Sequence, residues 1–190
     1  ITGNVTAVDF TNDGDIAFIG TQGGAVFKLS GLQQLYTVAD VSKLSVSTLN
    51  TQGAGPITDL ILDKSDNNRL LVTTGGYGSA DGVLYSENAL GAGTLKNIHG
   101  NLPNMPVYTA AFERNDRNIA LVGTEFGLWA TSSLTETVPE WLDKNDQLSY
   151  VPIYAMEQQE LPWHKAKNTG TYFIGSFGRG FWQTSSLVGV

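Results

Sequence analysis

Short apolar runs separated by polar turns recur four times along this chain. Each repeat opens with one run, passes through a turn into a second run, and ends with a third. The repeats begin at Val5, Ile57, Val107 and Ile153, so they are spaced by 52, 50 and 46 residues. The runs of the successive repeats are 5–10, 16–21 and 25–29; 57–62, 70–74 and 83–86; 107–112, 119–124 and 128–131; and 153–156, 171–176 and 181–184.

The runs are rich in β-branched and aromatic residues, and Gly, Asn, Asp and Ser fill the turns between them, which predicts β-hairpins. Helical periodicity is nearly absent. A weaker fourth run follows three of the repeats, at 44–49, 95–99 and 141–142. Pro56, Pro106 and Pro152 directly precede three repeat starts, where a strand loses no ladder bond. Four strands per repeat predict an all-β fold, a β-propeller with antiparallel four-stranded blades at approximately 1–50, 51–100, 101–148 and 149–190.

The last repeat stops after its third run, and only Ile1–Asn4 precede the first repeat. An open blade needs a closing strand, because exposed sheet edges promote aggregation. We therefore expect the C-terminal part of a seven- or eight-bladed propeller, with the remaining blades supplied by the same longer protein or by another chain. A four-bladed closure and a ring made by two chains are the alternatives.

Composition narrows the possible partners. The net charge is −7, and the 11 Lys and Arg residues are scattered, so nucleic acid is a poor candidate. The chain has no cysteine, which excludes disulfides and thiolate chemistry. No apolar run approaches 18 residues, so we expect no insertion into a membrane. A start at Ile1 rather than Met indicates a processed or internal piece of a longer protein.

Two segments carry a family resemblance: Gly-Leu-Trp-Ala-Thr-Ser at 127–132 and Gly-Arg-Gly-Phe-Trp-Gln-Thr-Ser at 178–185. They resemble the sialidase-like, Asp-box (BNR-type) propeller superfamily, which includes bacterial surface propellers, sortilin-type receptor domains, photosystem assembly propellers and xyloglucanases. The Asp box is degenerate, because 131–141 keeps a Ser and Trp141 without Asp-Gly between them. The sialidase arginine cluster is missing. The resemblance implies a bacterial protein that is secreted or on the cell surface.

In a propeller the loops between second and third strands open on the face around the central channel, which usually carries ligands. Three of these loops present an aromatic residue flanked by or next to glycine: Tyr77, Phe126 and Phe177. They are candidates for stacking on sugar rings or gripping a peptide. The alternative is that they wedge between neighbouring blades. Arg179 lies in the last of these loops and is either a ligand contact or a structural residue at a blade seam.

Carboxylates test the possibility of an enzyme. A glycosidase needs two of them roughly 5 to 10 Å apart. For a xyloglucanase-like hydrolase the catalytic candidates are Asp9, Asp59 and Asp81. Nothing in the sequence pairs these aspartates, and an inner-strand Asp bonded to backbone is the commoner case. The polar turns at 12–15, 63–68 and 115–118 lack calcium-loop spacing, and His99 and His164 are isolated, so we expect no metal site and no cofactor.

These observations favour a non-catalytic role. We expect a binding or scaffolding propeller of a bacterial secreted or cell-surface protein, which meets a polysaccharide or a protein partner on its loop face. The first alternative is part of a xyloglucanase-like glycoside hydrolase. The second is an assembly-factor propeller.

Overall fold

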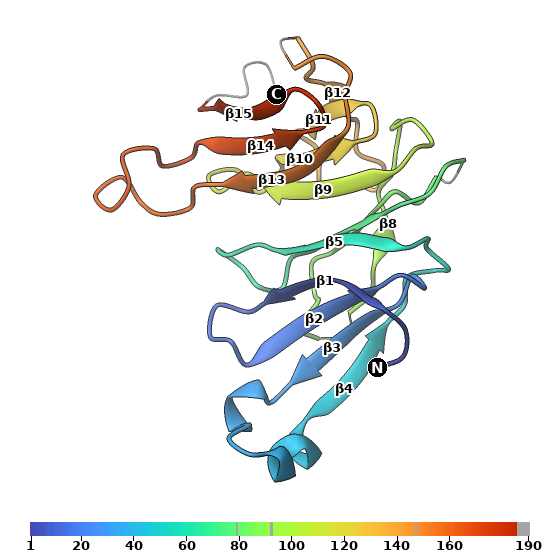
Figure 1. The fold of residues 1–190 in the computed structure, drawn as a ribbon, viewed down its shortest axis with the longest axis vertical. Helices are drawn as coiled ribbons and strands as arrows, with labels where there is room; N and C mark the ends of the chain where they lie inside the picture. Colours follow the sequence, from blue (N-terminus) through green and yellow to red (C-terminus); the bar gives the residue numbers. More distant parts are fainter. Residues whose placement is uncertain (79, 92, 147, 186–190) are drawn as a thin grey trace.

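A computed structural model describes residues 1–78, 80–91, 93–146 and 148–185, which form four antiparallel sheets in sequence order (Figure 1). Each sheet corresponds to one sequence repeat, and we number the sheets as blades 1 to 4. Blade 1 contains β1 (Val5–Phe10), β2 (Ile16–Thr21), β3 (Val26–Ser30) and β4 (Ser45–Leu49); blade 2 contains β5 (Ile57–Leu62), β6 (Leu70–Thr74), β7 (Val83–Ser86) and β8 (Lys96–Asn97). Blade 3 contains β9 (Val107–Phe112), β10 (Ala120–Thr124), β11 (Gly127–Thr131) and β12 (Leu142–Asp143); blade 4 contains β13 (Ile153–Gln158), β14 (Tyr172–Ser176) and β15 (Gly180–Thr184).

The propeller prediction is confirmed, including the weak fourth strands. Two of these, β8 and β12, are only two residues long, and blade 4 has three strands among its described residues. The sequence pattern did not indicate the two 3-10 helices between β3 and β4, η1 (Leu32–Gln34) and η2 (Val38–Lys43). Neither helix has a buried residue, so no apolar periodicity marks them.

The first strands of the four blades, β1, β5, β9 and β13, lie side by side, and we call them the inner strands (Figure 1). The later strands of each blade lead away from them. Blades 1 and 4 extend in opposite directions, and blades 2 and 3 recede behind the inner strands (Figure 1). The blades therefore form an arc with a free face at each end.

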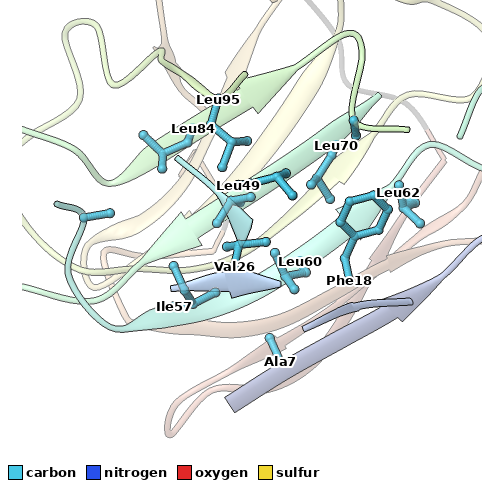
Figure 2. Close-up of a cluster of buried hydrophobic side chains, with 13 residues drawn as sticks. Ala7, Phe18, Val26, Leu49, Ile57, Leu60, Leu62, Leu70, Leu84 and Leu95 are labelled. Carbon is cyan, nitrogen blue, oxygen red and sulfur yellow. The ribbon is translucent and has the colours of Figure 1, made fainter. Parts of the chain in front are cut away.

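The core consists of three apolar clusters, one at each seam between consecutive blades. Alternate residues of each strand point to opposite faces of a blade, so one strand contributes to two seams. At the first seam Phe18 and Val26 of blade 1 pack against Ile57, Leu60 and Leu70 of blade 2, and all five are at most 3% exposed (Figure 2). Each blade is consequently stabilised by its neighbours rather than by an interior of its own.

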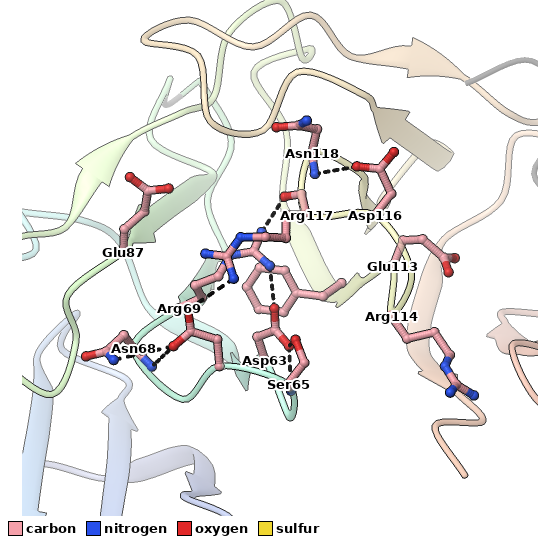
Figure 3. Close-up of polar contacts among 12 residues, drawn as sticks. Asp63, Ser65, Asn68, Arg69, Glu87, Glu113, Arg114, Asp116, Arg117 and Asn118 are labelled. Carbon is pink, nitrogen blue, oxygen red and sulfur yellow. Dashed lines mark hydrogen bonds and ion pairs between the residues drawn. The ribbon is translucent and has the colours of Figure 1, made fainter. Parts of the chain in front are cut away.

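Arg69 holds the second seam from inside (Figure 3). Its side chain is 1% exposed and donates to the carboxylate of Asp63 and to the carbonyl of Arg117 in blade 3. Its guanidinium also lies 4.7 Å from the ring centroid of Phe112. The sequence placed this arginine beside a turn, and the fold makes it a buried link between two blades.

A β-bulge recurs at the same place in every blade. The pairing of the inner strand with its neighbour shifts register between its first and third residues, and the residues passed over are Thr6, Thr58, Tyr108 and Tyr154. An extra residue in one strand bends it and re-aims a side chain. The fourfold recurrence shows that the bulge is part of the repeat, and it lies at the end of the inner strand that meets the loop face.

Candidate functional site

The loops that connect second to third strands are tied to the segment before each inner strand, and together they define the loop face. In every blade the first residue after the second strand donates its amide to the carbonyl of the residue directly before the inner strand. The four hydrogen bonds are 2.8 to 3.0 Å long and run from Gln22 to Asn4, Gly75 to Pro56, Glu125 to Pro106 and Phe177 to Pro152. Three of the four acceptors are the prolines that the sequence placed at the repeat starts. The loops thus have a fixed origin on the scaffold.

The three aromatic residues that the sequence singled out are exposed on this face. Tyr77 is 74% exposed, Phe126 48% and Phe177 64%. Phe126 stacks on Tyr150 with ring centroids 4.8 Å apart, and Phe177 meets Tyr154 edge-on at 6.1 Å. These contacts brace the rings of Phe126 and Phe177 from one side and leave the rest of both side chains open to solvent. The three rings are therefore not all packed between blades. That they bind a ligand stays a prediction.

Three tyrosines extend the group, and we call Tyr77, Tyr108, Phe126, Tyr150, Tyr154 and Phe177 the aromatic patch. Tyr108 and Tyr154 are the bulge residues of blades 3 and 4, and their rings meet edge-on at 4.6 Å. Our selection from the loops missed Tyr154. The signal that identifies it is its place as second residue of an inner strand, where the recurring bulge turns the side chain toward the loop face.

Glu125 gives the patch a negative charge. Its carboxylate accepts a hydrogen bond from the hydroxyl of Tyr108. Burial, followed by this carboxylate, raises the pKa of Tyr108 above its ordinary value, and the same two causes raise the pKa of Tyr77. Both tyrosines are therefore neutral donors at physiological pH.

Arg179 is exposed and has no hydrogen bond or ion pair with any other residue in the described part of the chain. A structural arginine would be bonded to Glu125 or to loop carbonyls, and Arg179 makes no such bond among the described residues. Arg179 shares its loop with Phe177, and because the residue is exposed its guanidinium donors are available to a ligand.

Beyond the loop face, the inner strands of all four blades line a central cavity of about 190 Å³. Asp9 and Asp59, two of the three predicted catalytic candidates, both line it. Glu157 and Glu160 line it as well, and sequence reasoning missed them. They come from blade 4, about 100 and 150 residues from the two aspartates, a separation over which no sequence motif operates.

The two cavity aspartates are held by structural contacts. Asp59 accepts from the amide of Leu60 at 2.9 Å and from the hydroxyl of Thr109 at 2.8 Å. Asp9 forms an ion pair with Lys64 at 2.7 Å and accepts from the amide of Leu62 at 2.8 Å. Each carboxylate thus ties its blade to the next, as an inner-strand Asp commonly does.

Burial is the largest cause that raises the pKa of Asp59 to about 6, and the charge of Glu157 adds to it. The hydrogen bonds from Thr109 and Leu60 oppose the shift. Partial burial, and then the charge of Asp9, raise the pKa of Glu157 as well. At Asp59 and Glu157 the cavity therefore favours the protonated carboxyl group more than water does.

Asp81 does not line this cavity. It lies in the loop between β6 and β7, where its Oδ1 is buried and has no hydrogen-bond partner among the residues that the structure describes. Burial lowers the pKa of nearby His99 and the charge of Asp81 opposes this shift. Nδ1 of His99 accepts from the amide of Gly82 at 3.2 Å. The structure thus brings together two of the three aspartates and leaves the third apart.

Each of the three polar turns contains a hydrogen bond between an aspartate side chain and the backbone of the same turn. In each turn an aspartate accepts from the amide two residues later: Asp13 from Asp15, Asp63 from Ser65, and Asp116 from Asn118. This is ordinary turn chemistry for Asp. Among the described residues no group of three or more His, Cys, Asp or Glu side chains is placed to hold a metal ion. No helix in that part of the chain is long and apolar enough to cross a membrane.

Comparison with known proteins identifies the fold. No protein-family model matches the chain, and no curated protein matches it. Among solved structures, the β-propeller domain of Myceliophteria thermophila Cps50 (Swd1) superposes with a TM-score of 0.63 at 16% identity over 93% of this chain and 50% of that one. An ancestral GH74 enzyme superposes with a TM-score of 0.63 at 14% identity over 96% of this chain and 23% of that one.

At these identities the likeness concerns the fold alone, and it places the chain among β-propellers without assigning it to the sialidase-like branch. The chain spans half the length of the first of these structures and less than a quarter of the second. A partial propeller agrees with the free face at each end of the arc.

Proposed function

We propose that this protein is a non-catalytic binding propeller of a bacterial secreted or cell-surface protein, and that its loop face binds a polysaccharide. The aromatic patch is the observation that carries the proposal. Tyr77 and Phe177 are the most exposed members of the patch, and both lie in loops anchored to the scaffold. Exposed rings in fixed positions bind with little loss of conformational entropy.

The chemistry of the patch suits a sugar chain. Aromatic faces pack against the apolar faces of sugar rings. Glu125 and the tyrosine hydroxyls supply acceptors and donors for sugar hydroxyl groups, and Arg179 supplies donors at the edge. The patch draws its rings from blades 2, 3 and 4, so it offers separate rings to consecutive units of a sugar chain.

A glycan array followed by titration calorimetry tests this function. We expect wild-type binding to at least one polysaccharide class, with affinity reduced about tenfold or more by Tyr77→Ala or Phe177→Ala, because removing a central aromatic contact costs about 1–2 kcal/mol or more. Tyr36→Ala is the matched control, since Tyr36 is 87% exposed but lies between η1 and η2, away from the loop face. Absence of glycan binding, together with capture of a purified protein partner that Tyr77→Ala abolishes, would assign the face to a protein instead.

A second candidate is a glycoside hydrolase, favoured by one observation. Asp9 and Asp59 line one cavity, and the pKa of Asp59 of about 6 suits a general acid. Against it, both carboxylates already hold the hydrogen bonds and the ion pair described above. Release of reducing sugar from soluble glucans, lost in Asp59→Asn but kept in Tyr77→Ala, would establish this function; no release from any glucan eliminates it for this chain.

A further inference from the structure

Two seams of the propeller share a socket built from glycine. A Cβ atom at Gly20 would lie 2.4 Å from Cγ2 of Ile57, and a Cβ at Gly123 would lie 2.7 Å from Cγ2 of Ile153. Ile57 and Ile153 open the inner strands of the following blades, and both are at most 1% exposed. The glycine is therefore required where a β-branched residue of the next inner strand approaches the second strand of the blade before it.

Gly175 of blade 4 occupies the equivalent position, but among the described residues no side chain of another blade packs against it. It pairs with Phe181 as Gly20 pairs with Val26 and as Gly123 pairs with Leu128. Among the described residues, a Cβ at Gly175 would meet only Ala155, at 3.6 Å or more. Its φ is not in the left-handed region, so the backbone itself does not require glycine here.

The surface around Gly175 is apolar and exposed. Phe181 is 72% exposed, whereas its equivalents Val26, Val83 and Leu128 are at most 2% exposed. Phe173 stacks on Phe181 with ring centroids 5.8 Å apart. We call Phe173, Gly175 and Phe181 the socket face; it has the form of a blade seam that lacks its partner.

The opposite end of the arc carries the complementary half. Val5, Val8 and Phe10 of β1 are 55, 50 and 48% exposed. Their equivalents in blade 2, Ile57, Leu60 and Leu62, are 1 to 3% exposed because blade 1 covers them. Val5 is β-branched and opens its inner strand, so it has the character of the residue that fills the sockets elsewhere. We call Val5, Val8 and Phe10 the plug face.

We propose that the socket face of one copy of this chain binds the plug face of a second copy, and the reverse, so that two chains complete one propeller. A second copy fits these faces because the seams within the chain already join the same kind of surface, with the same glycine socket and the same type of residue. Blades 1 and 4 lie at the two ends of the arc (Figure 1). In the proposed dimer a two-fold axis relates the two copies, and both pairs of faces meet. Two identical contacts close the assembly and leave neither face exposed.

Sedimentation velocity with light scattering tests the proposal on the chain as it stands. We expect a dimer, and we expect Gly175→Val to weaken the dimer at least tenfold, because the added side chain occupies the socket. Gly175→Val should fold normally, since a Cβ there meets no atom of its own chain closer than 3.6 Å; circular dichroism at concentrations where both proteins are monomeric verifies this. Val38→Ser is the matched control, because Val38 is 90% exposed outside both faces and its loss should leave the dimer unchanged.

Cysteine cross-linking tests the register. The chain has no cysteine, so a mixture of Val5→Cys and Gly175→Cys can form only the designed heterodisulfide and homodisulfides. At the existing sockets the Cβ positions lie 2.8 and 2.9 Å apart, so the seam need open by only about 1 Å to reach disulfide geometry. We expect the heterodisulfide to form faster than with Val38→Cys as partner of Gly175→Cys.

Three results would overturn the proposal. A monomer at every concentration would mean that something else covers these faces, such as further blades of a longer chain. A dimer that persists in Gly175→Val would place the contact elsewhere. Equal cross-linking of Gly175→Cys with Val5→Cys and with Val38→Cys would show that the faces do not meet in register. Because neither face includes the aromatic patch, these outcomes are independent of the glycan experiment.

Discussion

Asp59 is a carboxylic acid at the centre of the inner strands whose pKa burial raises to about 6. Between the unfolded pKa near 3.8 and this value, the unfolded state loses a proton that the folded state keeps. Stability therefore falls as pH rises through this window and levels off above it. A difference of this size corresponds to up to about 3 kcal/mol.

Asp59→Asn removes this titration while preserving the shape of the side chain. We expect the free energy of unfolding of the variant not to decline between about pH 4 and pH 6. Because that of the wild type falls, the difference, variant minus wild type, should increase across this window. Urea denaturation at a series of pH values measures it, with Asp116→Asn, an exposed turn residue, as control. Parallel pH profiles for wild type and Asp59→Asn would contradict the expected coupling.

Arg69 is the buried charge on which the second seam depends. Arg69→Met leaves Asp63, 5% exposed, without its cation and takes away the contact with Phe112. Breaking one half of a buried ion pair costs about 3–5 kcal/mol. Arg117→Met is the matched control, because its ion pair with Asp66 is exposed, and such pairs contribute at most about 1 kcal/mol. Equal losses in urea denaturation would mean that Arg69 is not specially placed.

At the level of strands and seams, substitutions at two equivalent glycines, Gly20 and Gly175, test the role of the socket. Gly20→Ala places a Cβ 2.4 Å from Ile57 and forces blades 1 and 2 apart, which should cost about 1–3 kcal/mol as overpacking does. Gly175→Ala at the equivalent position of blade 4 meets no such contact within its own chain, so at concentrations where the chain is monomeric it should change the melting temperature by little. If both substitutions destabilise the protein alike, the glycines serve the strand rather than the seam.

For the whole molecule, stability should be graded along the arc. In a repeat protein each unit gains its stability from its neighbours. Blades 2 and 3 have a neighbour on both sides, and every residue of β6 and β10 is buried, whereas β15 has no buried residue. We expect the slowest amide hydrogen exchange in β6 and β10 and the fastest in β4 and β15. Measuring amide exchange in Gly175→Val as well separates this gradient from any effect of association. Uniform protection along the chain would contradict the expected gradient.

The candidate site was predictable in part. The second-to-third loops identified Tyr77, Phe126, Phe177 and Arg179, because loop position follows from strand order and strand order follows from local patterns. The bulge residue Tyr154 and the cavity residues Glu157 and Glu160 were not found. A bulge depends on how two strands register, and the cavity gathers side chains about 100 to 150 residues apart, so neither leaves a signal within one repeat.

Burial separated residues that look alike in the sequence. Trp141 is 1% exposed and donates from its indole to the carbonyl of Ile98, whereas Trp163 is 67% exposed. Arg69 is enclosed between blades and Arg179 is open to solvent. Nothing in the local sequence distinguishes these pairs, because exposure depends on whether a neighbouring blade covers the residue.

The sequence by itself determined the strands, the fourfold repeat and the β-propeller fold, since alternation and turn residues act over a few positions. Only the tertiary structure decided which aromatic rings face solvent, which carboxylates share a cavity, and which glycine sockets are filled. These features arise where one blade meets the next, and a seam joins residues about 30 to 50 positions apart. The same physics leaves Gly175 and Val5 uncovered, because each is half of a seam whose other half lies outside the blades that this chain packs together.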